Sequence, residues 1–155
     1  MIKPLSKSEI KELNKKIREI FGIENFFHKK DNVVLKKENN EKSVLKDNKE
    51  IFFYSKEDIV PNLHLLQGEN FLKKVTVDMG AIRFVTNGAD VMRPGITKID
   101  ETIRKGDIVV VIDEINNKPL AVCRALFDAE EMKTMKEGKV LENLHYVGDK
   151  RWKNS

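Results

Sequence analysis

Two glycine corners and two arginines lie within one short stretch, residues 78–96, and together they could bind a phosphate chain. The guanidinium groups of Arg83 and Arg93 can each donate paired hydrogen bonds to phosphate oxygens. Gly88 and Gly95 let the backbone turn without steric penalty, and bare backbone at such corners can approach a sugar-phosphate chain closely. The stretch therefore predicts a contact surface for a polyanion.

Each of these residues could also have a purely structural role. Gly88 occupies the position that ends a helix, where glycine is favoured because it accepts a left-handed backbone. Gly95 could only shape its loop, and Arg83 could pair with the carboxylate of Asp90. Asp78, at the start of the predicted helix, would repel a phosphate, so an anion site at that helix terminus is not expected. We therefore assign the binding role to the region rather than to any single residue.

The distribution of charge favours the same region. The chain carries a formal net charge of +4, and its excess of cations is local. Residues 73–105, which begin with Lys73 and Lys74, hold seven basic and four acidic side chains, whereas residues 106–155 hold eight basic and nine acidic ones. A local positive surface attracts polyanions because counterions are released when they bind. An ordinary solvated surface rich in lysine would give the same count, so charge alone does not decide.

A second basic cluster lies near the C-terminus, where Lys150 and Arg151 precede Trp152. A basic run with an aromatic ring can bind a single strand by stacking and charge. The alternative, which we favour, is that the Trp152 ring packs against the domain and closes it while the charges stay in water.

No residue pattern calls for catalysis. The histidines His28, His64 and His145 are far apart and form no ligand-spaced pair, and Cys123 sits in an apolar run typical of a buried core residue. There is no nucleophile elbow, phosphate-binding P-loop or dinucleotide fingerprint. We therefore expect no enzyme activity, no cofactor and no metal.

The elements before residue 73 predict a small α+β domain. Ser6 and Glu9 form a capping box, apolar residues recur on one face from Ile10 to Phe21, and Gly22 ends this helix. Polar connections then separate three short strands, predicted at Asn32–Lys36, Ser43–Lys46 and Glu50–Tyr54. The polar stretch Gln67–Asn70 is typical of a linker, so we place the domain boundary near residues 67–73 and divide the chain into domains at residues 1–72 and 73–155.

The second part predicts a barrel of short strands with two short helices. The helices are Met79–Thr86, capped by Asp78, and Ala129–Lys136; residues 97–105 are predicted to be a loop. The remaining segments alternate between apolar runs and turns, as in a closed β-barrel. The predicted strands are Val75–Val77, Ala89–Met92, Ile108–Ile112, Leu120–Phe127 and Val140–Val147.

Two segments of this second part resemble a known family. Val75–Ile96 reads VTVDMGAIRFVTNGADVMRPGI and Arg104–Val111 reads RKGDIVVV, and both are similar to the PUA domain, named for pseudouridine synthases and archaeosine transglycosylases. With Pro61–Leu66 and Glu142–Trp152, the chain also resembles the T-cell malignancy-associated translation factor and the N-terminal half of ligatin. The resemblance implies an α+β protein whose second domain is a pseudo-barrel of mostly antiparallel strands.

The resemblance also implies an RNA-binding surface on the helix and glycine corners. With the basic residues of the two clusters, the candidate contact residues are Lys73, Lys74, Gly80, Arg83, Asn87, Gly88, Ala89, Arg93, Pro94, Gly95, Lys150 and Arg151. Similar proteins act with tRNA at the small ribosomal subunit, in initiation and recycling. A translation-initiation-factor-like protein would have to be a separate partner, because this chain carries no such domain.

Three functions therefore remain open. The first is a translation-associated RNA-binding protein, and the second is a non-catalytic accessory of an enzyme that modifies tRNA or rRNA. The third is a protein adaptor that docks through its N-terminal helix and phenylalanines, although those side chains could equally fill a small core. We expect a cytoplasmic monomer without a membrane partner, since no apolar run approaches the roughly 20 residues needed to span a bilayer.

Overall fold

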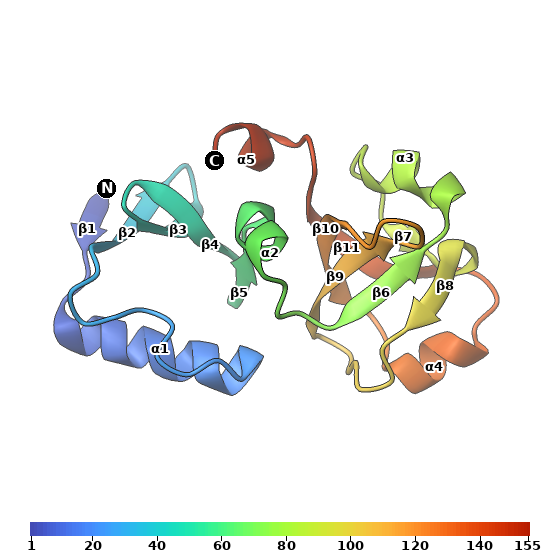
Figure 1. Ribbon diagram of the computed structural model, residues 1–155, viewed down its shortest axis with the longest axis horizontal. Helices are drawn as coiled ribbons and strands as arrows, with labels where there is room; N and C mark the ends of the chain where they lie inside the picture. Colours follow the sequence, from blue (N-terminus) through green and yellow to red (C-terminus); the bar gives the residue numbers. More distant parts are fainter. The chain divides into compact units, whose positions relative to one another are not determined.

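The computed structural model describes residues 1–155 and divides the chain into two compact units, Met1–Pro61 and Asn62–Ser155 (Figure 1). No helix in it is long and apolar enough to cross a membrane. The expected α+β fold is confirmed.

The first unit is a five-stranded antiparallel sheet with one long helix, α1, against one face (Figure 1). The strand order β1-β2-β3-β4-β5 follows the sequence. Tight turns with positive φ connect β2 to β3 at Asn39-Asn40 and β3 to β4 at Asp47-Asn48. The elements are β1 (Ile2–Pro4), α1 (Lys7–Phe21), β2 (Val33–Glu38), β3 (Glu41–Lys46), β4 (Lys49–Ser55) and β5 (Asp58–Pro61).

Helix α1 forms as predicted because its signals are local. Ser6 Oγ accepts a hydrogen bond from the Glu9 N–H, and the Glu9 carboxylate accepts one from the Ser6 N–H. Gly22 ends the helix with φ of 73°. Lys3 and Ser6 hydrogen-bond the Glu9 carboxylate and lower its pKa to about 2. Phe52 is fully buried in an aromatic cluster with Phe26 and Phe27, so the phenylalanines proposed for docking are largely core residues.

The second unit is a curled six-stranded sheet in the order β7-β11-β10-β9-β6-β8. Only the β6–β9 pair is parallel. Its core contains fully buried side chains such as Val75, Val111 and Leu141. The elements are α2 (Leu63–Gly68), β6 (Lys74–Val77), η1 (Met79–Ala81), α3 (Ile82–Val85), β7 (Val91–Met92), η2 (Arg93–Gly95), β8 (Ile96–Ile99), β9 (Ile108–Asp113), β10 (Pro119–Ala125), α4 (Ala129–Thr134), β11 (Lys139–Tyr146) and α5 (Lys150–Lys153).

Several boundaries differ from the prediction. The segment 97–105 was expected to be a loop, but Ile96–Ile99 forms strand β8 because it pairs with β6, about twenty residues earlier in the chain. Strands β1 and β5 were not predicted, since three or four residues carry little periodicity. Cys123 is fully buried as predicted, and burial raises the pKa of its thiol.

The chain passes from the first compact unit to the second between Pro61 and Asn62, whereas the sequence analysis placed the domain boundary after residue 72. The reason is helix α2, which packs on β10 of the second unit and buries Leu63 and Leu66. The Leu63 N–H also donates to Nε2 of His145 on β11. A polar linker was expected after these leucines, but their contacts belong to the second unit.

Candidate nucleic-acid interface

The predicted helix is built by η1 and α3, which together form a short platform at the end of β6. Asp78 caps it, because its carboxylate accepts a hydrogen bond from the Ala81 N–H at 2.9 Å. Thr86 closes the last turn through its hydroxyl, which donates to the Ile82 carbonyl at 2.8 Å. Val85, near the end of α3, is the only buried residue of the platform, and its other side chains are partly or fully exposed to solvent. The helix predicted over Met79–Thr86 is thus present as two joined turns.

The two glycine corners that the sequence singled out lie against this platform. The Asp78 N–H donates to the Gly95 carbonyl at 2.9 Å, which ties η2 to the start of η1. A Cβ on Gly95 would lie 3.1 Å from Cβ of Ala81, so glycine permits this close approach. The structure therefore places Gly95 against Asp78 and Ala81, at the start of the platform.

Gly88 is required both by its backbone and by its neighbour. Its φ of 93° is in the left-handed region, and a Cβ there would lie 3.1 Å from the ring of Tyr146. The adjacent Ala89 carbonyl accepts a hydrogen bond from the Asn143 amide at 3.0 Å. Asn87 and Ala89 themselves remain exposed. The corner is therefore rigid, with its outer side open to solvent.

Arg83 and Phe84 form the most accessible cationic and aromatic pair of the platform. Phe84 is 55% exposed, and the Arg83 guanidinium lies 4.8 Å from the centre of its ring. The alternative that Arg83 pairs with Asp90 is wrong: Asp90 accepts from the Asn143 N–H and pairs with Lys139. The Arg83 guanidinium thus has no carboxylate partner in the structure.

Phe84 was not among the contact residues predicted from the sequence. The signal was present, because Ile82 and Val85 are three residues apart and define the inward side of a short helix. Phe84 must then face away from the core. An aromatic ring in this position offers a stacking surface to a nucleobase.

Arg93 has a different environment from Arg83. Its Nε donates to the Met132 carbonyl on α4, and its Nη1 donates to the Ile96 carbonyl at 3.3 Å. The side chain therefore joins η2 to α4. Two of the guanidinium nitrogens that were expected to bind phosphate donate to backbone carbonyls instead. Its first role in this structure is to hold the corner.

Replacing Arg93 by alanine is expected to lower the free energy of unfolding by about 1–2 kcal/mol, because two carbonyls lose their donor. The salt dependence of RNA binding should change little. Urea unfolding followed by the fluorescence of Trp152 measures the first quantity, and filter binding at several salt concentrations the second. Lys98→Ala, an exposed neighbour on β8, is the control and should cost less than about 0.5 kcal/mol. A fall in the salt slope without loss of stability would instead assign Arg93 to phosphate.

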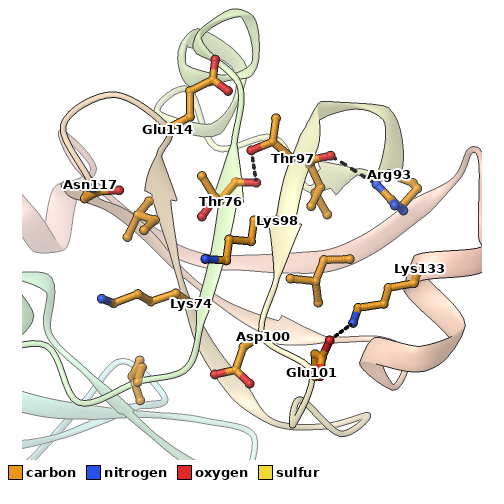
Figure 2. Close-up of a pocket in the computed structure, with 14 residues that line it drawn as sticks. Lys74, Thr76, Arg93, Thr97, Lys98, Asp100, Glu101, Glu114, Asn117 and Lys133 are labelled. Carbon is orange, nitrogen blue, oxygen red and sulfur yellow. Dashed lines mark hydrogen bonds and ion pairs between the residues drawn. The ribbon is translucent and has the colours of Figure 1, made fainter.

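The two lysines that precede the platform also differ. Nζ of Lys73 donates to the Thr102 carbonyl at 2.8 Å and to the Asp107 carboxylate at 3.1 Å, so it fastens the loop before β9. Lys74 is exposed on β6 beside an open depression of about 1140 Å³ (Figure 2). Lys98 projects from β8 next to it, and Thr97 donates to the Thr76 carbonyl.

This depression is of mixed charge. Asp100 and Glu114 line it together with the lysines, and Lys133 is already paired with Glu101 at 2.9 Å (Figure 2). Lys74 and Arg93 are the only predicted contact residues among those that line it. The predicted contact residues are thus divided between two places in the structure. Arg83 lies on the platform, whereas Lys74 and Arg93 line the depression.

The C-terminal cluster lies on α5, a third location. The ring of Trp152 stacks on His64 of α2, with centroids 3.8 Å apart and an interplanar angle of 12°. His64 Nε2 also lies 3.0 Å from the Trp152 carbonyl. Trp152 therefore packs on α2, which the sequence assigned to the first domain, and not on the barrel as expected. Lys150 is exposed, while Arg151 is partly buried and its carbonyl accepts from Ser155.

No group of three or more His, Cys, Asp or Glu side chains in this structure could hold a metal ion. The platform offers a guanidinium group, an exposed aromatic ring and open backbone corners. These are groups of the kind that can contact a polyanion and stack on its bases.

Comparison with known proteins identifies the family of the chain. The family model of the PUA domain matches residues 73–147. A protein of Methanocaldococcus jannaschii is 41% identical over 96% of this chain and 93% of its own length. Translation machinery-associated protein 20 of Saccharomyces cerevisiae is 33% identical, over 68% of this chain and 62% of its own length.

Solved structures give the same result for the fold. A protein from Pyrococcus horikoshii superposes with a TM-score of 0.84 and 33% identity, covering 99% of this chain and 98% of its own. An H/ACA ribonucleoprotein bound to a substrate RNA matches 62% of this chain and 29% of its own, with a TM-score of 0.51 and 26% identity.

Malignant T-cell-amplified sequence 1 of Rattus norvegicus aligns with 96% of this chain and 87% of its own length, at 31% identity. Because the match spans both units and not the PUA domain alone, the chain belongs to the family of PUA-domain proteins that includes malignant T-cell-amplified sequence 1 and translation machinery-associated protein 20.

Proposed function

We propose that this protein binds RNA through the η1–α3 platform and acts with the translation machinery. The observation that carries the proposal is the Arg83–Phe84 pair: a cation without a carboxylate partner over a ring that is 55% exposed. The exposed Asn87–Ala89 corner and Pro94 flank it. A phosphate can bind the guanidinium while a base stacks on the ring, as in other sites for single strands.

The translation role is supported by the names of two relatives, translation machinery-associated protein 20 and malignant T-cell-amplified sequence 1. Within that role we propose that the RNA is tRNA or the rRNA of the small ribosomal subunit, at initiation or recycling. A separate translation-initiation-factor-like protein would complete the assembly. The protein acts in the cytoplasm as a monomer and is not an enzyme, since the platform binds without a nucleophile or a general base.

The double substitution Arg83→Gln with Phe84→Ala tests the platform. We expect affinity for a tRNA to fall at least tenfold, because base stacking alone contributes about 1–3 kcal/mol. The salt slope of log K should decrease by roughly 0.7–0.9, as for one lost phosphate contact. Fluorescence anisotropy with labelled tRNA at 50–200 mM salt measures both.

A matched control is Ile20→Ala with Lys37→Gln, which also removes one exposed apolar side chain and one exposed cation. Both residues belong to the first unit, whereas η1 and α3 belong to the second. Equal losses in both double variants would refute a specific platform. Sedimentation of an extract at low salt tests the assembly: a protein that stays off the small subunit and does not shift tRNA has another function.

One observation favours a second candidate, a non-catalytic accessory of an enzyme that modifies RNA. The PUA unit shares its fold with part of the H/ACA ribonucleoprotein, whose structure was solved with a substrate RNA. Co-purification of a modifying enzyme without ribosomal proteins would support this candidate over the first.

A further inference from the structure

Helix α1 carries a row of cations on one side. Lys7, Lys11 and Lys15 follow one another at four-residue spacing, and Arg18 lies three turns after Lys7. Residues at these spacings share one side of a helix, and the row extends for about 16 Å at 1.5 Å per residue. All four side chains are exposed. We call these four residues the α1 stripe.

The stripe stays on the surface, because another side of α1, roughly 120° away around the helix axis, packs in the core. Ile10, Leu13 and Ile17 are buried there against the sheet of the first unit. The register between the two sides is therefore fixed by packing. The four cations stay in solvent as one group.

The loop after α1 adds two more cations to this side. It doubles back along the helix (Figure 1), and Asn14 holds it through both polar atoms of its amide. Asn14 donates to the Phe27 carbonyl at 2.8 Å and accepts from the Phe27 N–H at 2.9 Å. Lys29 and Lys30 follow this anchor and are exposed. Because Asn14 lies between Lys11 and Arg18 on the helix, the loop adjoins the stripe.

None of these cations has a carboxylate within ion-pair distance, although Glu12 and Glu19 are three and four residues from Lys15 on the same helix. The stripe and the two loop lysines make no ion pair in the structure. The acidic residue nearest the helix start, Glu9, is already bound by Lys3 and by the Ser6 cap. Like charges at four-residue spacing destabilise an isolated helix. A surface that retains such repulsion is complementary to an anionic ligand with repeated charges.

We propose that the α1 stripe with Lys29 and Lys30 is a second RNA-binding surface, which contacts the phosphate backbone of a double-stranded segment. A row of flexible ammonium groups recognises charge spacing and not base edges, so this contact is independent of sequence. The proposal rests on the proposed function, in that the ligand is RNA, but it uses residues of the first unit alone. The platform would then bind an unpaired RNA segment, and the stripe a double-stranded one.

The test compares two triple variants of the full chain. Lys7→Gln, Lys11→Gln and Lys15→Gln remove three stripe charges and keep good helix formers. Lys16→Gln, Lys37→Gln and Lys49→Gln remove three exposed, unpaired lysines of the same unit outside the stripe. The probe is a labelled RNA hairpin with a long duplex stem, titrated at 50 and 200 mM salt.

We expect the salt slope of log K to be about 2.7 smaller in the stripe variant than in the wild type. Between 50 and 200 mM salt, the affinity of the stripe variant should therefore fall roughly 40-fold less than that of the wild type. The control should keep the wild-type slope. Circular dichroism should show unchanged helix content in both variants. A stripe variant with the wild-type slope overturns the proposal, and so does an equal change in the control, which would indicate net charge only.

Two further measurements distinguish the stripe from the platform and from a membrane contact. The affinity for single-stranded RNA should be nearly that of the wild type in the stripe variant and much weaker in the Arg83→Gln/Phe84→Ala variant. If instead the stripe variant loses this affinity and the Arg83→Gln/Phe84→Ala variant keeps it, the proposed division of roles is wrong. If both variants still bind single-stranded RNA, the proposed platform is wrong, but the proposal for the stripe is unaffected. If the wild-type protein binds vesicles that contain phosphatidylserine but does not bind the RNA hairpin, the stripe is a membrane contact and the proposal fails.

Discussion

Replacing Gly88 by valine is expected to lower the free energy of unfolding of the second unit by about 3 kcal/mol, from a left-handed backbone that costs roughly 1–2 kcal/mol and from overpacking of similar size. The φ of 93° strains any β-branched residue. The new Cβ would also meet the Tyr146 ring at 3.1 Å. Urea unfolding followed by the fluorescence of Trp152, the one tryptophan, reports on this unit.

The two causes can be separated by a double-mutant cycle. Gly88→Ala should be less costly when Tyr146 is also replaced by alanine, because the clash disappears and only the backbone strain remains. Gly68→Ala is the control: that glycine has an ordinary φ, and a Cβ there meets nothing within 4 Å. If Gly88→Val were as mild as Gly68→Ala, the close approach of the corner to Tyr146 would be refuted.

Replacing Asp149 by alanine is expected to lower the free energy of unfolding by about 3 kcal/mol, because a buried imidazole and two backbone donors lose one common acceptor. The Asp149 carboxylate accepts from the N–H groups of Tyr146 and Trp152 and from Nδ1 of the fully buried His145. Since the Leu63 N–H donates to Nε2 of His145, that nitrogen carries no proton, and Nδ1 is the donor to Asp149. One carboxylate therefore connects β11, α5 and the start of α2.

The same site predicts a dependence of stability on pH. Burial raises the pKa of Asp149, but hydrogen bonds from His145, Trp152 and Tyr146 outweigh it, so the pKa lies below its usual 3.8. The carboxylate thus stabilises the fold above pH 3.8, and this contribution is lost as the pH falls through the lowered pKa. The difference in stability between wild type and Asp149→Asn should shrink in that range, as acid titration of unfolding would show.

Ser6→Ala provides the comparison for Asp149. Ser6 also caps a helix, but on an exposed surface, so its loss should cost only about 1 kcal/mol. Equal costs for Asp149→Ala and Ser6→Ala would mean that the contacts to His145 contribute nothing beyond a helix cap.

Features that depend on near neighbours in the chain could be predicted from the amino-acid sequence. The capping box of α1, the Asp78 cap and the left-handed glycines at residues 22 and 88 all depend on the residues within one turn. Together with the alternation of apolar runs and turns, they were enough to predict the α+β class, the strong strands and the region of the candidate interface.

The remaining features each depend on a distant segment, so they became visible only in the folded chain. Strand β8 exists through its pairing with β6, and α2 joins the second unit through His145, more than eighty residues later. Arg83 and Arg93 look equivalent in the sequence, yet the Arg93 guanidinium donates to the carbonyls of Met132 and Ile96, whereas the Arg83 guanidinium lies over the exposed ring of Phe84. Residue types and spacing thus indicated which groups could bind RNA. Packing across the fold set which of them remain available, since burial and hydrogen bonding to distant residues are not encoded in local spacing.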